Sequence, residues 1–198
     1  MRDQHRFDMK AWLLWMVGFL AFPIGGFLAL AIVDRIDDAG SALVGGLLAG
    51  AVIGAGQWLV ARRRLGDPFA WVAATAFGMG IGLFIGAQVV GYGTSLGDLA
   101  LMGAITGVPL GAAQALLLRG RVANAWIWAA AMPVLWALGW TVTTIGGIGV
   151  DSQFAVFGAY GAITFMALSG VLLDRLRAAT PATQPVRPVQ PAAPSSIA

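Results

Sequence analysis

The sequence predicts an all-α integral membrane protein with six transmembrane helices, arranged as three tandem, parallel helical hairpins with pseudo-three-fold symmetry. Of its residues, 59% are hydrophobic and only 11% are charged, whereas an ordinary soluble domain carries about a quarter charged residues. The charges lie in short clusters between uncharged stretches of about 20 residues, the length that crosses a bilayer core. A phrase that occurs twice in the chain predicts the hairpins.

The six uncharged stretches are the predicted helices. In chain order they cover 11–33, 40–60, 69–90, 99–118, 125–146 and 152–173. None of them has the polar face that a helix of a soluble protein keeps toward water. The first follows Arg2, Arg6 and Lys10, as a signal peptide would, but signal-peptide apolar cores run only about 7–15 residues. We therefore expect a retained helix.

Basic residues predict the orientation. Eleven of the 12 Lys and Arg residues flank the helices on one side, and the loops of the other side hold aspartates with Arg35 as their only basic residue. The positive-inside rule places the basic side and both termini in the cytoplasm, as expected for a bacterial inner-membrane protein. Six tryptophans near the basic ends are expected at headgroup level: Trp12, Trp15, Trp58, Trp71, Trp126 and Trp128.

The basic surface suggests lipid as its partner. The arginines are spread over short clusters that flank the membrane, so we expect anionic lipid at the cytoplasmic face and no nucleic acid. The transmembrane domain covers 1–177. The remaining segment, 178–198, is rich in proline and alanine, which predicts a disordered cytoplasmic tail with polyproline II tendency.

The repeated phrase is "GAGQWLVARRR" at 54–64 and "GAAQALLLRGR" at 111–121. A looser third copy follows 161, where "GAIT" repeats the letters at 103–106. Fixed-period similarity predicts three hairpins, at about 11–64, 69–121 and 125–177. Small residues recur in steps of four on the second, fourth and sixth helices, and such faces allow helix backbones to approach closely in lipid. These packing positions are Gly46, Gly50, Gly54, Gly103, Gly107, Gly111, Gly161 and Ser169.

Three glutamines lie within the predicted spans. Gln57 and Gln114 occupy the same repeat position, and Gln88 lies toward the outer half of the third helix. A glutamine at this depth could line a polar vestibule, or it could bond a neighbouring helix. We favour the second interpretation, because polar residues commonly tie membrane helices together.

The sequence contains few residues that could carry catalysis. The chain has no cysteine and no glutamate, and its one histidine, His5, lies in the N-terminal flank. A thiolate site, a His-based metal site in the bundle and Ser–His catalysis are therefore excluded. We expect no cofactor, no metal and no enzymatic activity.

The "GxxQWLVxRR" phrase, followed by an Ala/Gly-rich helix that opens with Trp, resembles repeats of uncharacterised bacterial multi-pass membrane proteins. The resemblance covers the hairpins but not the tail, and it implies no activity. We expect an accessory or scaffold element of the inner membrane, with other membrane subunits or further copies of this chain as candidate protein partners. The alternative is a channel or facilitator for a small uncharged or weakly polar solute along the pseudo-symmetry axis.

Overall fold

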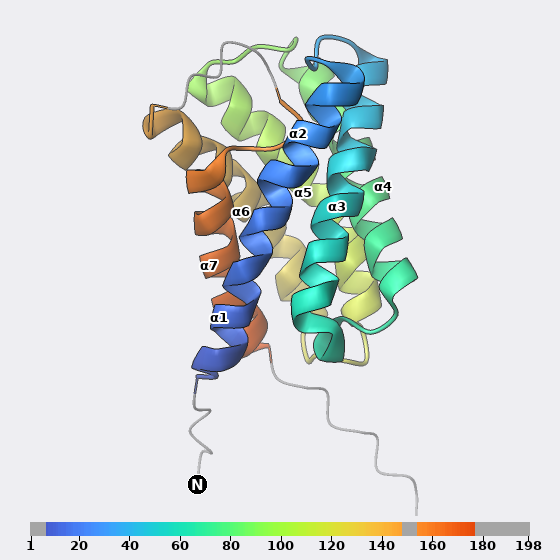
Figure 1. The fold of residues 1–198 in the computed structure, drawn as a ribbon, viewed down its shortest axis with the longest axis vertical. Helices are drawn as coiled ribbons and strands as arrows, with labels where there is room; N and C mark the ends of the chain where they lie inside the picture. Colours follow the sequence, from blue (N-terminus) through green and yellow to red (C-terminus); the bar gives the residue numbers. More distant parts are fainter. Residues whose placement is uncertain (1–6, 148–153, 177–198) are drawn as a thin grey trace, which may run out of the picture.

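The computed structural model describes residues 7–147 and 154–176, and the regular elements of these residues are helices (Figure 1). Arg2, Arg6 and the tail at 178–198 lie outside the described residues. The elements in chain order are α1 (Met9–Val17), the 3₁₀ turn η1 (Gly18–Leu20), α2 (Ala21–Val33), α3 (Ala39–Leu65), α4 (Pro68–Val89), α5 (Leu96–Leu118), α6 (Ala125–Ile145) and α7 (Ala159–Arg175).

Among the described residues, five helical segments are long and apolar enough to cross a membrane: Met9–Val33, which combines α1, η1 and α2, and the helices α3, α4, α5 and α6. The expectation of a multi-pass membrane protein is thereby confirmed. The expected count of six spans is not confirmed by these five, because α7 has only 17 residues and is about 26 Å long.

The last helix begins later than the predicted stretch at 152–173. Residues 154–158 are not helical, and α7 starts at Ala159. The Phe157 ring is 1% exposed and packs 5.3 Å from the Phe22 ring and 4.9 Å from the Trp136 ring, measured between centroids. Burial of this large ring stabilises a bent segment in place of another helical turn. The prediction of one continuous helix from 154 onward was therefore wrong; 152 and 153 lie outside the described residues.

The first span is also interrupted. Pro23 has no N–H to donate to the Phe19 carbonyl, and the chain tightens into the 3₁₀ turn η1 just before it. The two halves of the span have different neighbours: α1 packs mainly against α7, and α2 packs against α3. The α1 half of the first span is consequently packed less closely against α3 than the α2 half.

Short polar side chains begin four of the helices. Asp8, Asp38, Asp67 and Ser95 accept hydrogen bonds from free N–H groups of α1, α3, α4 and α5, at donor–acceptor distances of 2.5 to 3.2 Å. Such caps each stabilise a helix by about 1 kcal/mol. Asp38, in the loop between α2 and α3, therefore has a role in starting a helix.

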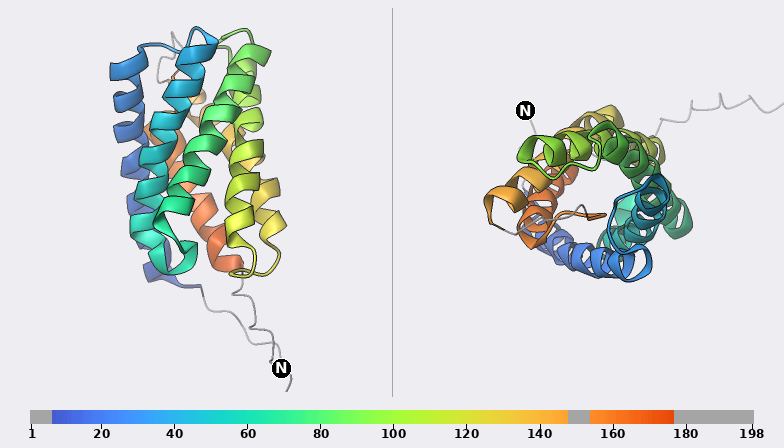
Figure 2. Two further views of the ribbon diagram at one scale, coloured as in Figure 1. Left: turned by 90° about the vertical axis from the view of Figure 1, so that its right-hand side faces the viewer. Right: turned by 90° about the horizontal axis from the view of Figure 1, so that it is seen from above.

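The helices form a closed ring when seen along the bundle (Figure 2, right). Helices that are consecutive in sequence pack side by side, and α7 packs against α1 to close the ring. The closest packing joins α3 to α4 and α5 to α6, that is, between the predicted hairpins. The start of α1, the end of α7 and the α3–α4 and α5–α6 connections lie together at the lower end in Figure 1. This end, the basic end, carries all the described Lys and Arg residues except Arg35.

Candidate functional site

Two of the three predicted glutamines meet inside the ring. Gln57 of α3 is 2% exposed and Gln114 of α5 is 1% exposed. The Gln114 amide donates to the Gln57 Oε1 at 3.4 Å and to the Thr75 Oγ1 of α4 at 3.0 Å. Gln88 is not part of this group: its side chain is exposed and donates to the Phe84 carbonyl of its own helix at 2.7 Å.

Buried tryptophans complete the group. The Trp71 Nε1 donates to the Gln57 Oε1 at 3.3 Å, and the Trp128 Nε1 donates to the Gln114 Oε1 at 3.0 Å. Each indole belongs to the helix that follows its glutamine in the chain, 14 residues further on. This equal spacing in the two copies of the phrase is a signal that sequence reasoning missed.

A third indole is bonded in the same way where the ring closes. The Trp15 Nε1 of α1 donates to the Ser169 Oγ of α7 at 3.0 Å, and the Trp15 ring meets the Trp128 ring edge-on at 6.4 Å. Ser169 thus accepts a hydrogen bond at a position that the sequence aligns with Gly54 and Gly111. We call this set the tryptophan–glutamine cluster: Trp15, Gln57, Trp71, Thr75, Gln114, Trp128 and Ser169.

Three of the six tryptophans expected at headgroup level are buried in the protein. Trp15, Trp71 and Trp128 are at most 2% exposed, so their rings contact protein and not lipid headgroups. Trp126 is 68% exposed, and Trp12 and Trp58 are partly exposed. All six lie near a basic end in the sequence. The buried three differ from the others in donating hydrogen bonds to side chains on neighbouring helices of the ring.

Six of the predicted packing positions lie where helix backbones approach closely. Gly46, Gly50 and Gly54 of α3 face α4, and the three glycines on α5 that correspond to them face α6: Gly103, Gly107 and Gly111. A methyl group on Gly50 would lie 2.8 Å from the Thr75 carbonyl oxygen, and one on Gly107 would lie 2.6 Å from that of Met132. Neither position has room for a side chain.

The packing positions on α7 differ from the others. Gly161 faces α6, where its N–H donates to the Thr143 Oγ1 at 3.2 Å, whereas Ser169 faces α1. The third predicted copy of the small-residue face therefore divides its contacts between two neighbouring helices. Phe165, which interrupts the steps of four in this copy, is buried among the rings of Phe22 and Trp136.

The tryptophan–glutamine cluster holds neutral donors and acceptors. A buried indole N–H or amide that lost its partner would cost about 1–3 kcal/mol, so the mutual hydrogen bonds favour one arrangement of the helices. Within the described residues, no group of three or more His, Cys, Asp or Glu side chains is placed to hold a metal ion. Chemically, the cluster can join helices and fill the interior of the ring.

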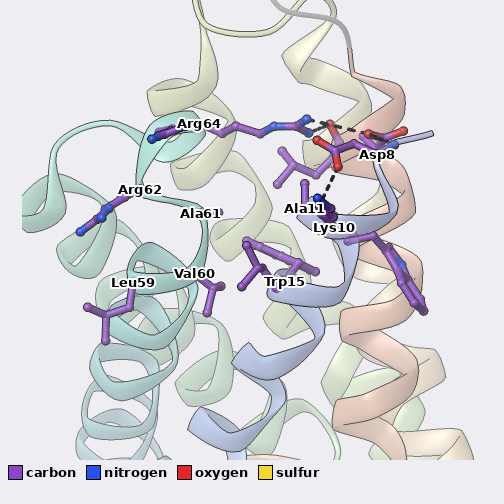
Figure 3. A pocket seen from close by; sticks show the side chains of 15 residues that line it. Asp8, Lys10, Ala11, Trp15, Leu59, Val60, Ala61, Arg62 and Arg64 are labelled. Atoms are coloured by element: carbon purple, nitrogen blue, oxygen red, sulfur yellow. Dashed lines mark hydrogen bonds and ion pairs between the residues drawn. The ribbon is translucent and has the colours of Figure 1, made fainter. Parts of the chain in front are cut away.

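A carboxylate at the basic end was missed by the sequence analysis. Asp174, near the end of α7, is only 3% exposed. Its Oδ1 accepts the Asp8 N–H at 3.4 Å and lies 3.8 Å from the Arg64 Nη2, while the Arg64 Nη1 donates to the Leu173 carbonyl at 3.2 Å (Figure 3). Asp174 thereby ties the ends of α1, α3 and α7 together. The sequence feature that could have indicated it is an acidic residue one position beyond the predicted span at 152–173.

Beside this ion pair lies a pocket of about 750 Å³, which we call the α1–α3 pocket. It is lined by the start of α1, the end of α3 and the end of α7. It forms where α1 leans toward α7 and leaves the end of α3 uncovered. The backbone of α3 is non-helical at Ala61, with φ −129° and ψ 25°, just before its three arginines.

Compared with models of known protein families, with curated proteins and with solved structures, the chain shows no match. The function must therefore be argued from the geometry of the bundle itself.

Proposed function

We propose that this chain is a non-enzymatic protein of the bacterial inner membrane that serves as an accessory or scaffold element. The observation that carries the proposal is the tryptophan–glutamine cluster. Side chains from α1, α3, α4, α5, α6 and α7 meet there, and each is at most 2% exposed. Indoles and amides that bond one another inside the ring leave the axis filled at this level.

The glycine contacts of α3 with α4 and of α5 with α6 support a rigid structural role. In lipid, helices gain little from hydrophobic burial, and close van der Waals packing through small residues becomes a main source of association. The glycines that face α4 and α6 are consistent with three tandem hairpins in which the second helix of one hairpin packs against the first helix of the next. The indole bonds to Gln57, Gln114 and Ser169 follow the same order around the ring and support the repeat.

The positive-inside rule supports the orientation. The basic end carries seven of the eight described Lys and Arg residues, and we place it in the cytoplasm. An accessory protein in this orientation has its broad apolar outer surface available to other membrane subunits or to further copies of itself. Exposed side chains such as Phe27, Phe77 and Trp126 belong to that surface.

The test separates the scaffold from a channel. Purified protein is reconstituted into liposomes, and the rate of osmotic swelling in glycerol or urea is compared with that of empty liposomes. We expect equal rates. Faster swelling that a Gln114→Leu change alters, while Gln88→Leu leaves it unchanged, would replace our proposal by a solute facilitator along the axis.

A second experiment addresses the partner. Crosslinking in native membranes, followed by purification, should recover a stoichiometric membrane subunit or a second copy of the chain. Recovery of the chain alone, as a monomer, at crosslinker concentrations that join a known membrane complex in the same cells would contradict an accessory role.

A further inference from the structure

The α1–α3 pocket has more basic groups than carboxylates in its lining. Lys10, Arg62, Arg63 and Arg64 line it together with Asp8 and Asp174. Arg64 pairs with Asp174, and the Asp8 carboxylate accepts the Ala11 N–H at the start of α1. Because the backbone is non-helical at Ala61, the three arginines that follow do not continue the side-chain directions of the preceding part of α3. With four basic groups and two carboxylates in its lining, the pocket keeps a net positive charge that can meet an anion from outside the chain.

The other wall of the pocket is apolar. Leu14 of α1 and Leu59 of α3 line it and are 56% and 66% exposed. Figure 3 shows Leu59 and Val60 below Arg62 and Arg64, with Trp15 of α1 across from Val60. The apolar wall lies on the side of the spans and the basic groups lie at the ends of the helices, so the pocket has the polarity of a lipid at the membrane boundary.

We propose that the α1–α3 pocket binds one anionic phospholipid, with its phosphate between Lys10, Arg62 and Arg63 and the start of an acyl chain along Leu14 and Leu59. A soluble anion would neutralise the basic groups and leave the apolar wall uncovered. A zwitterionic lipid would bring a cation toward the same basic groups. The proposal rests on the membrane placement argued above and not on the accessory role.

The other basic connection supplies a matched control. Arg119 and Arg121 follow α5 at the same end of the bundle, outside the α1–α3 pocket. The Arg121 guanidinium lies against Gly66, in the connection between α3 and α4. A change of both arginines to glutamine removes the same charge from the same face as the change at Arg62 and Arg63.

The experiment is native mass spectrometry of the full chain in detergent, titrated with phosphatidylglycerol or with phosphatidylcholine of the same acyl chains. We expect one phosphatidylglycerol per protein, bound in preference to phosphatidylcholine. The R62Q/R63Q variant should bind it about 30-fold more weakly, because a basic group near an anionic lipid contributes about fivefold. R119Q/R121Q should bind it as the wild type does. Ala61→Trp, which fills the pocket without changing charge, should also weaken binding.

Several results would overturn the proposal. Equal binding of the two lipids, or equal losses in the two double-arginine variants, would indicate nonspecific adsorption. Full binding by Ala61→Trp would place the lipid elsewhere, and displacement by inorganic phosphate at millimolar concentration would indicate a site for a soluble anion. Monodisperse elution and unchanged circular dichroism verify that each variant is folded. Absence of lipid binding would leave the liposome result unaffected, so the two proposals fail separately.

Discussion

Replacing Gly107 by alanine should separate α5 from α6. The added methyl carbon would lie 2.5 Å from the Pro133 Cα and 2.6 Å from the Met132 carbonyl carbon and oxygen. These are backbone atoms, which cannot rotate away as a side chain could. Carbon contacts are favourable at about 3.5–4.0 Å, so the helices must move apart locally by about 1 Å, which forfeits a quarter to a half of the dispersion energy there. Overpacking of this kind costs about 1–3 kcal/mol.

The assay is unfolding in mixed micelles with increasing sodium dodecyl sulfate, followed by circular dichroism. Gly97→Ala is the matched control, because it adds the same methyl group to the same helix at an exposed position, where the nearest atom is the Ser95 Oγ at 3.8 Å. We expect Gly107→Ala to unfold at a lower detergent fraction than the wild type, and Gly97→Ala to unfold at the same fraction or a higher one. Equal midpoints for the two variants would refute the packing argument.

Three further predictions use the same reasoning. A double-mutant cycle between Gln114→Leu and Trp128→Phe, measured by the same unfolding assay, should give a coupling of about 0.6–1.7 kcal/mol, the range of membrane hydrogen bonds; additive effects would mean that the bond contributes nothing. Asp174→Leu should lower the free energy of unfolding by about 1–3 kcal/mol and Asp174→Asn by less, because asparagine keeps an oxygen for the N–H at the start of α1; equal losses would contradict this role. Since the chain has no cysteine, single cysteines at Asp98 and Arg119 report topology in spheroplasts: an impermeant thiol reagent should label the first and not the second, and the reverse pattern would invert the orientation.

Much of the helical framework could be predicted from local sequence. Uncharged length alone located five membrane-spanning segments, with ends that differ from the observed ones by a few residues in most cases. The bent segment around Phe157 was not predicted, because it depends on packing against distant parts of the chain. Phe157 is held by rings from α2 and α6.

The candidate site was predictable only in part. The repeated phrase singled out Gln57 and Gln114 as equivalent, and the structure brings them together. Gln88 has the same chemistry but points away from the ring, and one sequence does not reveal which face of an apolar helix meets lipid. Asp174 was not singled out, because its burial results from the way α7 closes the ring against α1.

The closure of the ring by its first and last helices has a consequence for biogenesis. The indole of Trp15 finds its acceptor 154 residues later, and the indole of Trp12 finds the Ala167 carbonyl 155 residues later. A ribosome adds about 5–20 residues per second, so α1 remains in the bilayer for roughly 10 to 30 s before α7 exists. During that time the nascent bundle is an open arc whose first helix exposes donors without acceptors. A chain terminated before Ser169 would keep that open edge permanently.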